Sequence, residues 1–214
     1  MMGKVLFISG IDTDVGKTVA TGVLAKQLAA QGHRVITQKM VQTGCTGLSA
    51  DLQTHRHIQG IDWLPEDLDG TTCPYVFAHP CSPHLAAALE QTEIDDQRIT
   101  AATEQLAAHY DYVLLEGAGG LAVPYRDDTT TLDYIARQGY PVVLVTSAKL
   151  GSINHTLLSL AACHMRSITL DTVVYNHYPC SDELIKENTR RYLHAYLAAH
   201  FPQAKWMDLA FTEW

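Results

Sequence analysis

Short runs of apolar residues alternate with amphipathic stretches along this 214-residue chain. Runs rich in Val, Ile and Leu are typical of buried strands, and apolar residues that recur at helical spacing are typical of amphipathic helices. The pattern predicts strands at 4–9, 34–37, 112–115, 141–145 and 172–175. It predicts helices from residue 19 to a stop at Gly32, then at 49–59, 82–89, 99–106, 131–138, 152–165 and 184–197.

Strands that are apolar throughout are typical of parallel sheets buried on both faces. Because strands and helices alternate, we expect an α/β fold with a mainly parallel sheet and helices on both faces. No repeat, linker or low-complexity segment interrupts the pattern, so residues 1–214 are predicted to form one domain. Apolar positions that define helix faces are Val19, Val23, Leu24 and Leu28, then Ile153, Leu157, Leu160 and Ala161, then Leu184, Ile185, Tyr192, Leu193, Tyr196 and Leu197.

The loop after the first strand carries the strongest chemical signal. Gly10 follows that strand, and Gly16-Lys17-Thr18 directly precedes the first helix. A glycine loop between strand and helix presents backbone N–H groups and the positive end of the helix dipole to an anion. Lys17 is placed to reach the β- and γ-phosphates of a nucleotide, and the Thr18 hydroxyl to ligate Mg²⁺. The fold is therefore expected to be P-loop NTPase-like.

The spacing of this loop departs from the general phosphate-binding motif. Five residues separate Gly10 from Gly16, whereas the motif has about four. The alternative is an ordinary glycine turn before a helix. The strand directly before the loop and the helix directly after it favour phosphate binding.

Polar residues at other element ends point to the same edge of the sheet, where open α/β sheets bind ligands. Glu116 follows strand 112–115, where an acid commonly helps to hold Mg²⁺; alternatively it caps a glycine turn. Asp51 begins a helix and is either a metal ligand or a residue that favours the helix dipole. Lys39, just past strand 34–37, is either functional or a solvated lysine.

A second helix start follows the strand at 141–145. The free N–H groups near Ser152, Ile153 and Asn154 form a possible second anion site, which suits a carboxylate. The alternative is a plain helix start.

Composition excludes several classes of function. A net charge of −8 disfavours nucleic acid, and no apolar run approaches the roughly 20 residues of a membrane span. The start of the chain shows no signal peptide, and five scattered cysteines without CxxC spacing suit reduced cytoplasmic thiols. The histidines lack the spacing of a metal site; His55 and His57, two apart, do not share a helix face.

Five stretches, in this order, resemble motifs of the dethiobiotin synthetase family. They are 10–18 (GIDTDVGKT), 39–44 (KMVQTG), 74–84 (PYVFAHPCSPH), 116–120 (EGAGG) and 149–155 (KLGSINH). The five-residue spacing between the loop glycines is normal for that family. The resemblance covers roughly residues 3–178.

This resemblance implies an ATP-dependent ring closure in biotin biosynthesis. The family converts 7,8-diaminononanoate, CO₂ and ATP into dethiobiotin, ADP and phosphate. One amine captures CO₂ as a carbamate, and the carbamate oxygen attacks the γ-phosphate to give a carbamic-phosphoric anhydride. The second amine then closes the ureido ring and expels phosphate.

The resemblance also implies roles for individual residues. Lys39, Lys17 and Thr13 would act at the reacting groups, and Thr18, Asp51 and Glu116 would surround the Mg²⁺. The substrate would be bound by Thr43 and by Ser152, Ile153 and Asn154, the last three at its tail carboxylate. The nucleotide would be bound by Asp14, Val15, Gly16, Lys17, Thr18, Val19, Asp51, Glu116, Gly117, Ala118, Gly119, Asn176 and His177.

The family acts as a homodimer in which the partner completes the substrate-tail site, and Tyr192 or Tyr196 is a candidate for that role. Met40 and His177 depart from the residues common in the family at these positions. The C-terminal region, 202–214, lacks the family's further segment with a proline-containing loop over the base. We therefore expect looser selectivity for the nucleotide base.

Two other functions share this architecture. A nucleotide-dependent switch or partitioning ATPase usually has a second lysine early in the loop, but Ile11, Asp12 and Thr13 stand there. An amidoligase carries a glutaminase domain, for which 214 residues leave no room.

Overall fold

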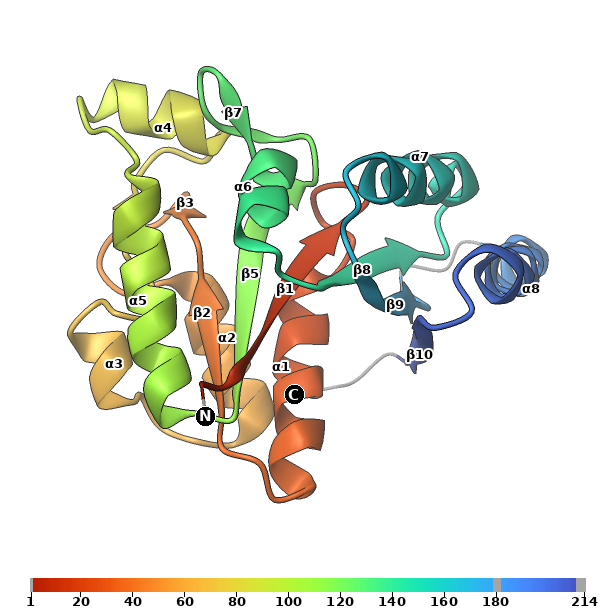
Figure 1. The fold of residues 1–214 in the computed structure, drawn as a ribbon, viewed down its shortest axis with the longest axis horizontal. Helices are drawn as coiled ribbons and strands as arrows, with labels where there is room; N and C mark the ends of the chain where they lie inside the picture. Colours follow the sequence, from red (N-terminus) through yellow and green to blue (C-terminus); the bar gives the residue numbers. More distant parts are fainter. Residues whose placement is uncertain (1, 179–181, 211–214) are drawn as a thin grey trace.

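A parallel sheet of six strands forms the centre of the part of the chain that the computed structural model describes, residues 2–178 and 182–210. The strands lie in the order β10-β9-β8-β1-β5-β2, and every neighbouring pair is parallel (Figure 1). Their bounds are β1 (Lys4–Gly10), β2 (Val35–Lys39), β5 (Tyr112–Gly120), β8 (Val142–Ser147), β9 (Leu170–Asn176) and β10 (Lys205–Leu209). The predicted α/β class with a mainly parallel sheet is confirmed.

Helices cover both faces of this sheet (Figure 1). Successive strand residues point to opposite faces. Phe7 and Leu115 therefore share one core cluster with Ile99 and Leu160, whereas Leu6 and Ala20 belong to another on the opposite face. The first face carries α5 (Asp96–His109), α6 (Thr131–Gln138), α7 (Ser152–Met165) and α8 (Glu183–His200); the second carries α1 (Lys17–Ala30) and α2 (Ala50–Gln59).

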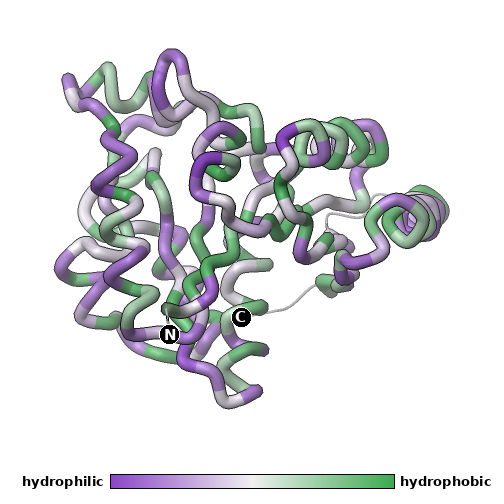
Figure 2. The backbone as a smooth tube through the Cα atoms, in the orientation of Figure 1, coloured by the Kyte–Doolittle hydropathy of each residue, from purple (hydrophilic) through white to green (hydrophobic). Residues whose placement is uncertain are grey.

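The outer helices combine hydrophilic and hydrophobic residues (Figure 2). Within residues 2–178 and 182–210, no helix is both long enough and apolar enough to cross a membrane.

Several helices lie where the sequence predicts them, and α2 and α6 among these have side-chain N-caps. The bounds of α6 and α7 equal the predicted ranges. In α6, the Thr130 hydroxyl accepts from the backbone N–H of Asp133, and Gly139 ends the helix at a φ of 67°. Ser49 likewise caps α2, because its hydroxyl accepts from the N–H of Leu52. These caps satisfy backbone groups that a helix end leaves free.

Short elements were not predicted. They are β3 (Gln42–Thr43), α3 (Pro65–Leu68), β4 (Val76–Phe77), β6 (Pro124–Arg126), β7 (Thr129–Thr130) and the edge strand β10. β3 pairs with β4 and β6 with β7, so each pair depends on a partner segment more than on its own pattern. The stretch 45–80 is therefore less irregular than expected. α4 (Pro83–Leu89) was predicted correctly, with Ser82 as its N-cap residue.

All five predicted strands are longer than expected, and the extensions of β2 and β5 change the position of two candidate residues. β2 runs to Lys39 and β5 runs through Glu116 to Gly120, so neither residue follows its strand. Lys39 pairs in register with Glu116, and Ile8 pairs with Glu116 on the other side. Pairing on both sides keeps β5 extended beyond its apolar run. Alternation then directs Lys39 and Glu116 to the face covered by α1 and α2.

Several predicted helix faces are wrong in detail. In α1 the buried positions are Lys17, Ala20, Thr21, Gly22 and Ala25, while the predicted apolar residues pack only partly buried. Small residues are buried because α2 packs closely: a Cβ on Gly22 would lie 3.1 Å from the Cβ of Ile58.

The buried faces of α7 and α8 also differ from the predicted ones. In α7 the buried line is Ser152, Thr156, Leu160 and Cys163, because the Thr156 hydroxyl pairs with that of Thr146 at 2.7 Å; Ala161 is exposed. In α8, Leu193 and Leu197 are buried, but Leu184 and Tyr192 are exposed.

Candidate active site

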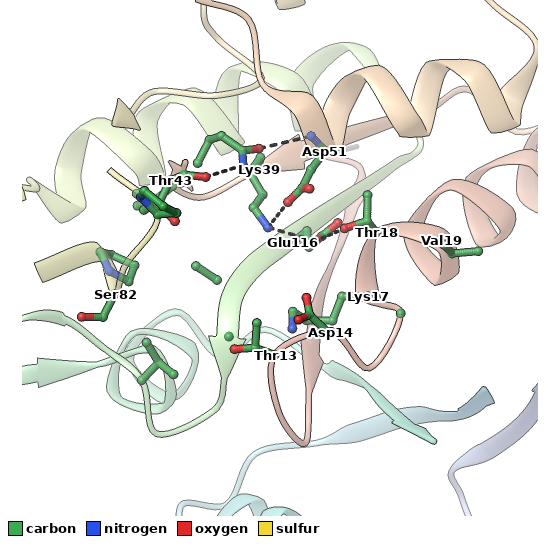
Figure 3. Close-up of a pocket in the computed structure, with 18 of the residues that line it drawn as sticks. Thr13, Asp14, Lys17, Thr18, Val19, Lys39, Thr43, Asp51, Ser82 and Glu116 are labelled. Carbon is green, nitrogen blue, oxygen red and sulfur yellow. Dashed lines mark hydrogen bonds and ion pairs between the residues drawn. The ribbon is translucent and has the colours of Figure 1, made fainter. Parts of the chain in front are cut away.

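A cavity of about 940 Å³ opens at the carboxyl ends of β1, β2 and β5. It brings most of the predicted site residues together (Figure 3). Those that line it are Thr13, Asp14, Gly16, Lys17, Thr18, Val19, Lys39, Thr43, Asp51, Glu116, Ala118, Gly119 and Asn176. Further residues that line the cavity were given no individual role from the sequence. Six of them lie in the motifs 39–44 and 74–84, namely Val41, Gln42, Pro80, Cys81, Ser82 and Pro83, and the others are Val123, Tyr178 and Ala210.

The remaining predicted residues are absent from this lining. The Val15 side chain packs in the core, and the Gly117 carbonyl accepts from Lys39 Nζ at 3.0 Å. His177 Nε2 lies 2.8 Å from Asp208 Oδ1, so this histidine bonds to β10. Ser152 pairs its hydroxyl with that of Ser147 at 2.9 Å, and Ile153 and Asn154 follow it in the first turn of α7. The second predicted anion site thus lies outside the cavity of this chain.

The loop between β1 and α1 has a tightly defined backbone. Gly16 has a φ of 95°, and a Cβ there would lie 2.4 Å from Asn176 Nδ2. The Asn176 amide donates to the Val15 carbonyl at 3.0 Å, which ties the end of β9 to the loop. Asp14 also has a positive φ, 57°. Only glycine adopts the Gly16 conformation freely and leaves room for the amide.

Lys17 is the first residue of α1, directly after this loop, and its Nζ donates to the carbonyl of Asp12 at 2.9 Å. Burial of the ammonium, reinforced by the nearby charge of Lys39, lowers the pKa of Lys17 from 10.5 to about 8. Two buried ammonium groups, Lys17 at the start of α1 and Lys39 at the end of β2, make this end of the cavity favourable for a polyanion.

Lys39 connects both acids of the site. Its Nζ donates to Asp51 Oδ2 at 2.5 Å and to Glu116 Oε1 at 2.9 Å (Figure 3). It also donates to the Gly117 carbonyl at 3.0 Å. An ammonium has three donors, so all are used. Burial alone would lower the pKa of Lys39, but the two carboxylates outweigh burial and raise it above its usual value. Lys39 is therefore not a solvated lysine.

Glu116 is fully buried and uses both carboxylate oxygens. Oε1 accepts from Lys39 and from the Thr18 hydroxyl at 3.1 Å, and Oε2 lies 2.8 Å from His55 Nε2. Burial alone would raise the pKa of Glu116, but the charge of Lys39 and the hydrogen bond from His55 hold it well below its usual range. Glu116 is thus an anion whose oxygens are held in fixed directions.

The helix α2 is positioned by polar contacts on both of its sides. Gln42 Oε1 accepts from the Ser49 hydroxyl at 2.6 Å and from the Asp51 N–H at 3.2 Å. Arg56 donates to both oxygens of Asp67, at 2.7 and 2.8 Å, and to the Thr37 hydroxyl at 2.7 Å. These bonds fix Asp51 at the rim of the cavity.

The oxygens of Thr18, Asp51 and Glu116 suit a small divalent cation. Mg²⁺ prefers oxygen ligands and is usually bound by one or two carboxylates together with phosphate oxygens and water. Both acids already surround one positive charge, the Lys39 ammonium. The residues present therefore fit the metal that the sequence suggested. Within residues 2–178 and 182–210, no cluster of three or more His, Cys, Asp or Glu side chains could hold a metal.

His55 is the residue that sequence reasoning missed. It was considered only beside His57, for metal spacing. The sequence did contain a signal for it: His55 lies four residues after Asp51, and residues four apart on a helix share a face.

The cysteines that the structure describes form no disulfide bond. Cys45, Cys73, Cys81 and Cys163 are free thiols, and Cys180 lies outside the described residues. Burial raises the pKa of Cys73 to about 12, so its thiol is inert. The predicted short C-terminal region falls partly at 211–214, also outside the described residues.

Known protein families match this chain along nearly its whole length. A family profile described as AAA domain matches residues 4–204. The ATP-dependent dethiobiotin synthetase BioD 2 of Haemophilus ducreyi is 58% identical over 206 residues, which are 96% of this chain and 98% of that protein. The ATP-dependent dethiobiotin synthetase BioD of Chlorobaculum tepidum is 53% identical over 210 residues, 98% of this chain and 88% of that protein.

Solved structures show a more distant likeness. The structure of pNOB8 ParA bound to nonspecific DNA has a TM-score of 0.59 with this chain and 15% sequence identity. The match covers 99% of this chain and 86% of that one. At this identity the likeness concerns the fold alone.

Proposed function

The chain belongs to the ATP-dependent dethiobiotin synthetase family, and we propose that it converts 7,8-diaminononanoate, CO₂ and ATP into dethiobiotin, ADP and phosphate. It would thus be a ligase that forms carbon–nitrogen bonds in biotin biosynthesis. Support comes from relatives of 53% and 58% identity that match it nearly end to end. The alternative, a switch or partitioning ATPase, has only the likeness of fold in its favour.

One observation carries the mechanism: Lys39 and Lys17 line the same cavity, next to Glu116 and Asp51. The reaction must bring a carbamate and a triphosphate together, and both are anionic. Two ammonium groups in a largely buried site stabilise charge that grows on the transferred phosphoryl group. We infer that Lys17 binds the β- and γ-phosphates and that Lys39 contacts the carbamate oxygen and the γ-phosphate.

Nucleotide binding follows from the loop and its neighbours. Backbone N–H groups at residues 13–19 would hold the phosphates, and Asn176, which lines the cavity at the end of β9, would contact the base. His177 is a weaker candidate than the sequence suggested, because its side chain bonds to Asp208.

We propose that Thr18, Asp51 and Glu116 hold Mg²⁺ when the nucleotide binds. The metal would neutralise phosphate charge and orient the γ-phosphate. Lys39 donates to both acids in this structure, so binding of the metal requires the ammonium to turn toward the anions.

The substrate would span two regions. Thr13 and Thr43 line the cavity and have hydroxyls suited to the amine or carbamate end. Ser152, Ile153 and Asn154 begin α7 outside that cavity. We propose that the chain forms a homodimer in which this helix start binds the tail carboxylate in the partner's site.

A mixing experiment tests the shared site. Lys39→Met chains and Asn154→Asp chains are each expected to be nearly inactive, and mixing them is expected to restore part of the activity. No recovery after subunit exchange would place the tail site within one chain.

The cytoplasmic location and the single-domain organisation remain predictions.

Phosphate release from Mg·ATP tests the proposed function. We expect release only when the diamine and bicarbonate are both present, with dethiobiotin detected by mass spectrometry. Omitting bicarbonate is the matched control for the carbamate step. Steady ATP hydrolysis that ignores the diamine would overturn the synthetase proposal in favour of a switch ATPase.

A further inference from the structure

His55 is a fully buried histidine that touches the site without lining it. It lies on α2, one turn after Asp51. The spacing of four residues directs both side chains to the face of α2 that covers Lys39 and Glu116. Its Nε2 lies 2.8 Å from Glu116 Oε2.

The two oxygens of Glu116 have different partners. Oε1 accepts from Lys39 at 2.9 Å and from Thr18 at 3.1 Å, both of which line the cavity. Oε2 bonds to His55 instead. Because Glu116 is ionised it can only accept, so Nε2 carries the proton of this bond. The bond fixes the plane of the carboxylate and leaves Oε1 as the oxygen that faces the cavity.

Burial alone does not explain an imidazole at this position. His55 Nδ1 is buried and has no hydrogen-bond partner among the described residues. An unpaired buried polar atom is unfavourable, and an apolar side chain of similar size would avoid it. The bond from Nε2 to Glu116 is therefore what the imidazole contributes.

The position of α2 does not depend on this bond either. Arg56, the next residue, bonds to Asp67 and to Thr37, and Ser49 caps the helix start. These contacts lie on other parts of α2. Loss of the imidazole is therefore expected to release the Glu116 carboxylate without releasing the helix.

We propose that His55 is a positioning residue that orients Glu116 as a one-oxygen ligand for the divalent cation of the nucleotide complex. This inference rests on the proposed role of Glu116 in the proposed function. Hydrogen-bond partners behind a metal ligand hold it in its binding direction, and their loss typically weakens metal binding about 10- to 100-fold.

The test replaces His55 in two ways and measures Mn²⁺ binding. His55→Leu removes the donor, whereas His55→Gln keeps an amide N–H that can reach the same oxygen. His57→Leu, on the exposed side of the same helix, is the matched control. Mn²⁺ is titrated by electron paramagnetic resonance in the presence of a non-hydrolysable ATP analogue, and melting temperatures are recorded for every variant.

We expect His55→Leu to weaken Mn²⁺ binding about 10- to 100-fold, and His55→Gln to recover most of the loss. In turnover, the KM for the metal should rise more than kcat falls. Mn²⁺ affinity of folded His55→Leu within twofold of the parent would overturn the proposal. So would equal losses in His55→Leu and His55→Gln that follow their melting temperatures, because that result indicates a purely structural role.

The two proposals fail separately. Mn²⁺ binding is measured without the diamine, so it reports on His55 whichever reaction the chain performs. Diamine-independent ATP hydrolysis by the parent protein would remove the synthetase proposal and leave the result for His55 standing.

Discussion

Lys39 and Asp51 form an ion pair of 2.5 Å between the last residue of β2 and the first turn of α2. The same ammonium bonds to Glu116, which is buried at the centre of the sheet. Lys39 therefore neutralises two acids that would otherwise repel each other. An anion that binds the Lys39 ammonium must therefore compete with the carboxylates of Asp51 and Glu116. This competition is removed if another cation neutralises the two carboxylates instead.

Lys39→Met is expected to lower kcat about 10²- to 10³-fold while ATP affinity changes little. In the proposed mechanism this substitution removes a charge that acts on the carbamate and the γ-phosphate, whereas the loop and Lys17 would still hold the nucleotide. Steady-state turnover and ATP binding by calorimetry measure the two quantities. Lys26→Met, an exposed lysine on α1, is the control. Equal losses of turnover and ATP affinity would indicate that Lys39 serves the nucleotide or the fold.

Lys39→Met is also expected to bind Mn²⁺ at least about tenfold more tightly than the parent when no nucleotide is present. The substitution removes a positive charge that lies within 3 Å of both acids and competes for their oxygens. Electron paramagnetic resonance measures the free Mn²⁺. Unchanged or weaker binding would contradict the competition between the ammonium and a divalent cation.

Asp67→Asn is expected to lower the free energy of unfolding by about 3–5 kcal/mol at pH 7, because Arg56 would keep a buried charge without its partner. Burial alone would raise the pKa of Asp67, but the bonds from Arg56 outweigh burial and lower it below 3.8. A carboxylate with a lowered pKa stabilises the fold above its unfolded pKa and loses that effect as the pH falls through its folded pKa. The difference between parent and variant should therefore shrink below about pH 4.

Denaturant titrations between pH 7 and pH 3 check this dependence. Asp62→Asn removes the same charge from an exposed position and is the control. A difference that stays constant over this range would mean that Asp67 acts by packing and not by its charge.

Gly16→Ala and Gly32→Ala separate backbone strain from steric overlap. Both glycines have a φ between 90° and 95°, where alanine costs about 1–2 kcal/mol. Nothing lies within 4 Å of a Cβ on Gly32, whereas a Cβ on Gly16 would meet Asn176 Nδ2 at 2.4 Å. Gly16→Ala should therefore lose more stability, and should lose ATP binding, which Gly32→Ala should keep. Urea unfolding and ATP titrations measure both, and similar losses would mean that strain alone matters.

Local signals in the sequence explain which elements could be predicted. α6 and α2 carry their own caps, Thr130 and Ser49, so their bounds depend on neighbouring residues in the chain. β10 has no such signal: it is a strand because Lys205 to Leu209 pair with β9, from Thr172 to Asn176. Pairing between distant segments is not contained in a local pattern, which is why this strand was missed.

The same distinction holds for the site. The sequence motifs identified Lys17, Thr18, Lys39 and Glu116 as candidate site residues. In the structure all four line one cavity. His55 belongs to no recognised motif, because the residue that it contacts, Glu116, is 61 positions away in the chain. The α8 face was predicted wrongly at Leu184 because helical spacing does not reveal which side of a helix meets the sheet.

The hydrogen bond between Thr18 and Glu116 joins residues 98 positions apart, and Asp51 comes from a third segment between them. No short stretch of the chain contains this set of oxygens. A partly folded chain therefore offers the proposed metal and nucleotide no assembled site, and their binding energy would add to the free energy difference between the folded and unfolded chain. At a ligand concentration of about 100 times its dissociation constant this addition is about 2.7 kcal/mol. Saturation with Mg·ATP would then protect the chain against unfolding and proteolysis as much as a well-packed core side chain does.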